Sequence, residues 1–79
     1  MRYEHEPGAN ATATAIRVGL ARKKSTQSAL AQHLKLSQPA IHRRMTGRVP
    51  WRLNELSDVA EYLGVAVTEL VGGSAEASA

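Results

Sequence analysis

A run of cations without any acid occupies the middle of this chain. The 79 residues carry 10 Lys and Arg against 7 Asp and Glu, a formal net charge of +3. Nine of these cations lie between Arg17 and Arg52, and every acid lies outside that stretch. A block of one sign this long favours binding to a polyanion, because its charges add to one positive field. The alternative interpretation is an ordinary solvated basic surface without a ligand.

Inside this block the sequence predicts two short helices joined by a tight turn. The segment from Gln27 to Gly47 reads QSALAQHLKLSQPAIHRRMTG. We expect one helix over 26–34, a turn at Lys35 and Leu36, and a second helix over 38–46. Gly47 then supplies a left-handed stop.

Residues with known capping behaviour mark the starts of both helices. Thr26 and Ser37 are good N-cap residues, since their hydroxyls accept from the orphan N–H groups of the first turn. Pro39 falls in the first turn of the second helix, where a missing N–H costs nothing. Leu36 and Ile41 have the spacing of a hydrophobic staple around that helix start.

The two helices must cross closely, and three residues bear on this. Ala31 is small enough to lie at the contact, and the β-branched Ile41 can pack into the first helix. The turn position favours a residue that tolerates positive φ. Lys35 occupies it, at a cost of about 1 kcal/mol relative to glycine.

The preceding helix is expected over 11–24, with Asn10 or Thr12 as its cap. Its apolar face contains Ala13, Ile16 and Leu20, spaced as on one side of a helix. Its last residues are cations, which suit the negative end of the helix dipole and can also contact phosphates.

The following helix is expected over 55–63, with Asn54 as N-cap and Gly64 after its end. Its apolar residues recur at helical spacing, and its acids are expected on the outer side, away from the basic block. A short fifth helix is predicted to start at Thr68. We expect Trp51 and Met45 in the core, Met45 as a gap-filler.

These elements predict an all-α fold: a compact bundle of four to five short helices that contains a helix-turn-helix. We expect one domain over 10–71, a flexible N-terminal arm over 1–9, and a disordered tail over 72–79.

The segment TQSALAQHLKLSQPAIHRRMTG, continued by PWRLNELSDVAEYLGV, resembles the lambda-repressor-like helix-turn-helix family. That family includes phage Cro and repressor proteins and Xre-type regulators. The resemblance covers about residues 12–71, and its most specific feature is the pair of glutamines, Gln27 and Gln38, that open the two helices. This sequence departs from the family pattern at Ser25 and Arg44, where apolar residues are common, and at Lys35, where glycine is usual.

The resemblance implies that the second helix reads bases in the DNA major groove. Gln38 corresponds to the principal base-contacting position, and a Gln amide can pair with adenine. Arg43 can contact guanine, and His42 a base edge or a phosphate. Pro39 has no polar group and can only pack on a thymine methyl.

The resemblance also implies a set of phosphate contacts that hold the helix in register. Gln27 is expected to contact a phosphate and to brace Gln38. The remaining residues assigned to phosphates by this resemblance are Lys24, Lys35, Ser37, Thr46 and Arg48. His33, on the first helix of the pair, is expected to be structural or solvent-facing.

Several other classes of protein find no support in the sequence. The chain has no cysteine, so it has neither disulfides nor thiolate metal sites. No apolar run approaches the roughly 20 residues of a membrane span, and the N-terminus lacks the apolar segment of a secretory signal. The trio Glu4, His5 and Glu6 is too local to hold a metal ion without further ligands. We find no catalytic constellation and expect no enzyme activity, no metal and no cofactor.

We therefore expect a sequence-specific double-stranded DNA-binding transcriptional regulator, Cro-like or a small repressor, in the bacterial cytoplasm. A homodimer is expected at least on DNA, because one recognition helix reads about half a site. The expected dimer surface is the fifth helix, with Val65, Val67, Leu70 and Val71. No small-molecule ligand is evident. The alternative is an antitoxin-type interaction module that holds another protein and also autoregulates by binding DNA.

Overall fold

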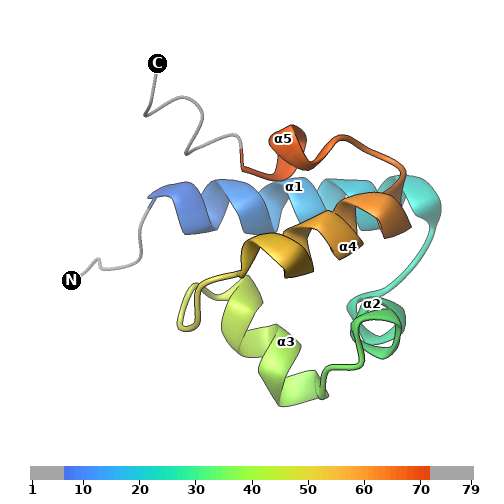
Figure 1. Ribbon diagram of the computed structural model, residues 1–79. Helices are drawn as coiled ribbons and strands as arrows, with labels where there is room; N and C mark the ends of the chain where they lie inside the picture. Colours follow the sequence, from blue (N-terminus) through green and yellow to red (C-terminus); the bar gives the residue numbers. More distant parts are fainter. Residues whose placement is uncertain (1–6, 72–79) are drawn as a thin grey trace.

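The computed structural model describes residues 7–71, and this part of the chain forms five α-helices and no strand (Figure 1). The helices are α1 (Pro7–Lys23), α2 (Gln27–Leu34), α3 (Gln38–Met45), α4 (Leu53–Leu63) and α5 (Val67–Leu70). The predicted all-α bundle is confirmed.

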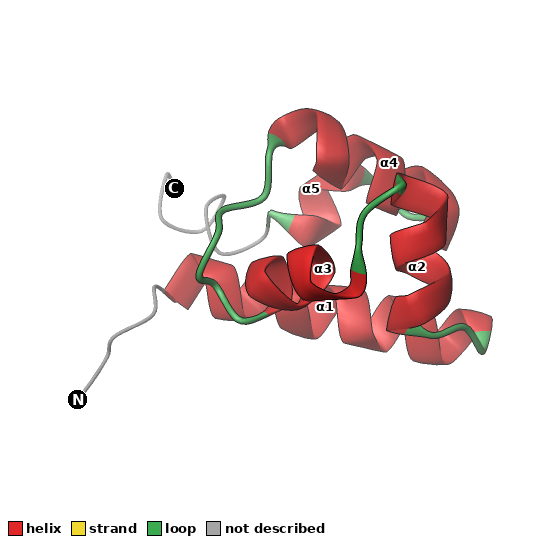
Figure 2. Ribbon diagram, turned by 90° about the horizontal axis from the view of Figure 1, so that it is seen from below, coloured by secondary structure: helices red, strands yellow, loops and turns green. Residues whose placement is uncertain are grey.

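The long helix α1 forms the centre of the bundle and packs against α3, α4 and α5. Helix α5 lies over α1 on one side, whereas α2 and α3 lie together on the other (Figures 1 and 2). Helix α4 packs against α2 as well as against α1 and α5. The pair α2–α3 is therefore presented at one end of the molecule by a scaffold of the other three helices.

Every helix from α1 to α5 contributes to a single core. Most of the apolar positions predicted from helical periodicity are buried there, which confirms the faces chosen for α1 to α4. The buried hydrophobic residues are Ala13, Ile16, Leu20, Leu30, Ala31, Ile41, Met45, Leu56, Val59, Ala60 and Leu70. Leu34 and Leu63 are half-buried and pack against this cluster.

Helix α1 begins earlier than predicted. It starts at Pro7, so residues 7–9 are helical and do not belong to an arm. Proline suits the first turn of a helix, because its missing N–H would have no intrahelical partner there. The predicted cap is also wrong: Thr12 lies inside the helix, and its buried hydroxyl donates to the Leu70 carbonyl at 2.6 Å. Thr12 thus ties α1 to α5. Residues 1–6 of the predicted arm lie outside the described residues.

Helix α4 also begins earlier than predicted, at Leu53, so Asn54 is not its cap. The N-cap residue is Arg52, whose backbone N–H donates to Glu55 Oε1 at 2.9 Å. This bond is the carboxylate half of a capping box. Gly64 ends the helix with φ of 74°, as its position in the sequence predicts.

Of the residues expected at a dimer surface on the fifth helix, Leu70 is not available at the surface. Leu70 is 1% exposed and belongs to the core. Val65, Val67 and Val71 are half-buried and pack against that core. A helix of only four residues must use its apolar side chains to attach itself to α1 and α4. The predicted disordered tail, 72–79, lies outside the described residues.

No helix among residues 7–71 combines the length and the apolar character needed to cross a membrane.

Candidate nucleic-acid interface

The turn between α2 and α3 has the predicted geometry. Lys35 ends α2 in the left-handed conformation, with φ of 61° and ψ of 38°. The N–H of Leu36 donates to the Ala31 carbonyl at 2.9 Å and closes the turn. Thr26 caps α2 by accepting from the Ala29 N–H at 3.0 Å. Lys35 therefore adopts a left-handed backbone conformation that glycine would adopt without strain.

The crossing of α2 and α3 is tight at the two predicted positions. Ala31 of α2 is 2% exposed and Ile41 of α3 is 1% exposed. Met45, one turn after Ile41, is also buried and fills the base of α3. These contacts hold α3 by one side and leave the opposite side in solvent.

The exposed side of α3 contains Gln38, Pro39, His42 and Arg43, which we call the α3 outer face. These are the four residues to which the sequence assigns base contacts. They belong to two successive turns of one helix, and so their side chains form a continuous edge. The structure brings all four predicted residues together.

The amide of Gln38 is positioned by a residue that the sequence analysis did not single out. Its Nε2 donates to Ser28 Oγ on α2 at 2.8 Å. We expected Gln27 to brace Gln38, but the hydrogen bond observed is with Ser28. Gln27 is half-buried at the start of α2. With one amide hydrogen held by Ser28, Gln38 retains a second N–H and its carbonyl oxygen for a ligand.

Three exposed cations with predicted phosphate contacts lie in the turns around α2 and α3. Lys24 connects α1 to α2, Lys35 connects α2 to α3, and Arg48 follows α3. Lys24 is not the end of α1, as predicted, but a left-handed turn residue with φ of 58°. All three charges stand at helix ends, where the chain projects into solvent.

Ser37 and Thr46 stand at the two ends of α3. Ser37 Oγ accepts from the Ala40 N–H at 3.1 Å, which is the predicted N-cap, and its own O–H stays free to donate. Thr46 Oγ1 donates to the carbonyls of His42 and Arg43 at 3.0 and 3.2 Å. The Thr46 hydroxyl is thus turned toward its own helix.

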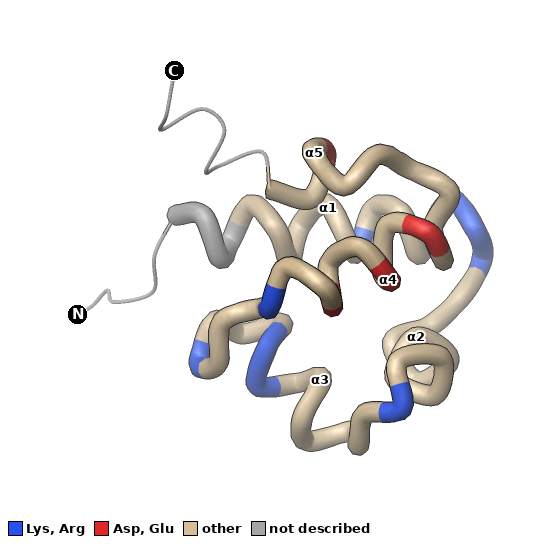
Figure 3. Tube along the Cα trace, viewed as in Figure 1, with Lys and Arg blue, Asp and Glu red and all other residues tan. Residues whose placement is uncertain are grey.

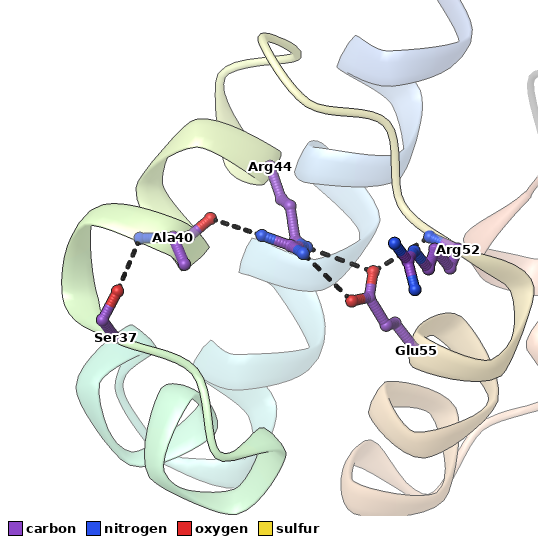
Figure 4. Close-up of polar contacts among 5 residues, drawn as sticks. All are labelled: Ser37, Ala40, Arg44, Arg52 and Glu55. Carbon is purple, nitrogen blue, oxygen red and sulfur yellow. Dashed lines mark hydrogen bonds and ion pairs between the residues drawn. The ribbon is translucent and has the colours of Figure 1, made fainter.

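Arg44 anchors α3 to α4 through the half-buried acid Glu55 (Figure 4). Its Nε and one terminal nitrogen donate to the two carboxylate oxygens, each at 3.1 Å, and the other terminal nitrogen donates to the Ala40 carbonyl at 3.0 Å. This two-point geometry is the strong form of an ion pair. Our expectation that the acids of α4 all face away from the basic block is wrong for Glu55.

The same contacts set the charge state of Glu55. Burial raises the pKa of this carboxyl, but the hydrogen bond from Arg44, the N–H of Arg52 and the two positive charges lower it more. The pKa of Glu55 therefore lies below its ordinary value of 4.5. The carboxylate remains ionised, and Arg44 remains paired, in mildly acidic solution.

This depressed pKa predicts an acid-dependent loss of stability. The unfolded Glu55 takes up a proton near its ordinary pKa, before the folded one does, so its contribution is complete above that pH and disappears as pH falls through the folded-state pKa. We expect urea unfolding to show this loss in the wild type and a flatter profile in Glu55→Gln. Arg44→Met should flatten the profile as well. Parallel profiles for wild type and Glu55→Gln would contradict the assignment.

Tyr62 of α4 contacts residues from α1, from α2 and from the turn between them. Its hydroxyl lies 2.6 Å from Ser25 Oγ, the polar residue where the resemblance favours an apolar one. The His33 ring packs against it at 4.8 Å between centroids, and the ammonium of Lys23 stands 4.9 Å over its face. His33 thus has a structural neighbour, and the cluster joins α2 to α1 and α4.

Trp51 packs against the core between α3 and α4, as predicted. It is half-buried, and its indole Nε1 is buried without an acceptor. The Trp51 ring therefore contributes apolar packing between the α3–α4 connector and the core, and its N–H makes no hydrogen bond.

The charges are segregated in space as they are in the sequence (Figure 3). Three of the described Lys and Arg lie on α1 and the others lie on α3 or in the connectors, whereas the described acids lie on α4 and α5. Glu55 pairs with Arg44, so the exposed cations on α3 and in the connectors are Lys24, Lys35, Arg43, Arg48 and Arg52.

The chain contains a capped helix, a left-handed turn and a second helix that packs against the core through one side. This arrangement defines a small helix-turn-helix domain. Among known families, the BetR domain matches residues 10–79, and the chain belongs to that family. Comparison with curated proteins and with solved structures gave no match.

Proposed function

We propose that this protein is a sequence-specific regulator of transcription that binds double-stranded DNA, of the Cro or Xre type within the lambda-repressor-like proteins. The observation that carries the proposal is the α3 outer face. Four side chains are exposed in two successive turns of a helix whose other side is locked into the core. Membership of the BetR family, a family of small helix-turn-helix domains, supports the same role.

The dimensions of α3 suit the major groove, which is about 12 Å wide and admits one α-helix. Gln38 stands at its first turn, where recognition helices contact base edges. Its free N–H and carbonyl oxygen match N7 and the N6 amine of adenine. Ser28 holds the amide in place and so reduces the conformational freedom lost on binding.

The remaining residues of the α3 outer face supply different contacts. Arg43 carries the paired donors that recognise guanine O6 and N7. His42 lies beside it and can reach a base edge or a phosphate. Pro39 offers only apolar contact, which fits a thymine methyl. The specificity then rests chiefly on Gln38 and Arg43.

The charged and polar groups around α3 fix its register without reading sequence. Lys24, Lys35 and Arg48 are exposed at the turns that border α2 and α3. The free O–H of Ser37 can join them. Phosphates on both sides of the groove can therefore be held while α3 lies between them.

Selecting bound duplexes from a random pool will give the operator, and two substitutions then separate the proposed roles. Gln38→Ala should lower the preference for the operator over single-base variants by about 1–3 kcal/mol, because it removes a base contact. Arg48→Ala should weaken binding to all sequences alike, because it removes a phosphate contact. The measurement is a titration of the operator and its variants.

A matched control is Arg22→Ala, since Arg22 lies in a pocket with Val65 and Glu69, beside α5 and away from α3. This substitution should leave both affinity and preference unchanged. Selection that returns no common sequence, or a Gln38→Ala variant with full preference, would reject the proposed base readout.

A further inference from the structure

A pocket lies between α1 and α5, on the side of α1 opposite the α2–α3 pair (Figure 1). Its volume is about 230 Å³, which is smaller than the roughly 300–1,000 Å³ of sites that hold drug-sized ligands. Its apolar lining residues are Ala15, Gly19, Leu63, Val65 and Leu70. A ligand of this pocket must therefore be small and must carry an apolar group.

Close packing holds the apolar part of the pocket in place. Gly19 of α1 lies so near to α4 that a Cβ at this position would come within 2.7 Å of Leu63 Cδ1. The Thr12 hydroxyl donates to the Leu70 carbonyl at 2.6 Å and so attaches α5 to α1. The pocket is therefore formed before a ligand arrives, which reduces the conformational cost of binding.

Two side chains of opposite charge line the same pocket. Arg22 comes from the last turn of α1, and Glu69 comes from α5. Both are exposed, and no ion pair joins them in the part of the chain that the structure describes. A simple anion would be repelled by Glu69, and a simple cation would be repelled by Arg22. A small molecule that carries both charges would find a partner for each of them.

We propose that the pocket beside α5 binds an aliphatic α-amino acid. Its side chain occupies the apolar part of the pocket and covers Val18, which is 44% exposed, so that apolar surface is removed from water. Its carboxylate accepts two parallel hydrogen bonds from the guanidinium of Arg22. Its ammonium group donates to the carboxylate of Glu69. This site goes beyond the proposed function and does not depend on it, because the pocket and the α3 outer face lie on opposite sides of α1.

Titration of the full chain with L-leucine, without DNA, tests the proposal. Amide proton and nitrogen resonances are followed by NMR. We expect saturable shifts that are largest at Gly19, Val65 and Glu69. Glycine, which lacks the apolar group, should bind at least about tenfold more weakly. Two further probes, 4-methylpentanoate without the ammonium group and 3-methylbutylamine without the carboxylate, should each bind about two- to fivefold more weakly, because the charges that they leave unpaired are exposed.

Two substitutions assign the charges of the ligand to their partners. Glu69→Gln should weaken L-leucine binding about two- to fivefold but strengthen binding of 4-methylpentanoate, because it removes a repulsion. Arg22→Ala should likewise weaken L-leucine binding and strengthen binding of 3-methylbutylamine. Opposite changes for two ligands of the same shape cannot arise from a general effect on folding. Arg17→Ala is the matched control, since Arg17 is an exposed cation of the same helix outside the pocket, and it should bind every probe as the wild type does.

Each other outcome overturns the proposal. The absence of saturable shifts up to the solubility limit of L-leucine excludes the site. Shifts centred on residues outside the pocket place any binding elsewhere. Equal affinity for L-leucine and 4-methylpentanoate, unchanged in Glu69→Gln, excludes recognition of the ammonium group. Because every titration is made without DNA, a protein that fails to bind DNA still gives a decisive result here.

Discussion

Replacing Ile41 by alanine is expected to remove about 2–4 kcal/mol from the free energy of unfolding. Ile41 is 1% exposed and joins α3 to the core at its crossing with Ala31. The substitution deletes buried methyl groups and leaves a cavity that a small core cannot fill. A domain of this length has a total stability of roughly 4–12 kcal/mol, so the loss is a large share of it. Urea unfolding followed by circular dichroism measures the change.

The control for this experiment is Val18→Ala, which also truncates a β-branched residue but at a position 44% exposed. Its effect is expected to stay within about 0.5 kcal/mol. A change below about 1 kcal/mol for Ile41→Ala would show that α3 is not held by its apolar side. DNA binding of Ile41→Ala should fall with the folded fraction rather than through any lost base contact.

Local signals explain why so much of this fold was predictable. Leu30, Ile41 and Val59 recur at helical spacing with other apolar residues, and the hydrophobic effect directs such faces inward. Thr26 and Ser37 cap the next helix through bonds three residues away, which the sequence displays directly. Both kinds of signal depend on neighbours within one or two turns.

Three of the errors arose where the structure of the whole chain decides a residue's surroundings. The sequence predicts Thr12 as a possible helix cap, but its hydroxyl donates to the Leu70 carbonyl, 58 residues away. Glu55 was assigned to solvent because an acid on an amphipathic helix usually faces water, yet it pairs with Arg44, 11 residues away. Helix α5 is too short for a periodic pattern to distinguish its buried side, and so Leu70 was placed on a surface.

The candidate interface shows the same division. The spacing within the motif was sufficient to place Gln38, Pro39, His42 and Arg43 on one exposed side of α3. It was not sufficient to identify Ser28 as the partner of Gln38. That bond crosses the turn, and its geometry depends on the left-handed conformation of Lys35.

Binding to DNA is expected to weaken steeply as salt concentration rises. Each phosphate neutralised by a cation releases condensed counterions, so the logarithm of the affinity falls with a slope of about −0.9 per contact against the logarithm of salt concentration. With roughly three contacts from each copy, made by Lys24, Lys35 and Arg48, the affinity of one copy for its half-site should fall roughly 40-fold between about 50 and 200 mM salt.

The variant Lys35→Gly makes this prediction specific to charge. Lys35 has φ of 61°, so glycine relieves backbone strain there and should raise stability by about 1 kcal/mol. The same change removes a cation from the turn between α2 and α3 and should reduce the salt slope by about one contact. Stability and affinity then move in opposite directions, which no general effect on folding can produce. Arg22→Ala, away from α3, should leave the slope unchanged. Tight binding that does not depend on salt, or an unchanged slope in Lys35→Gly, would contradict phosphate contact by this turn, because a cation that neutralises a phosphate must release its counterions.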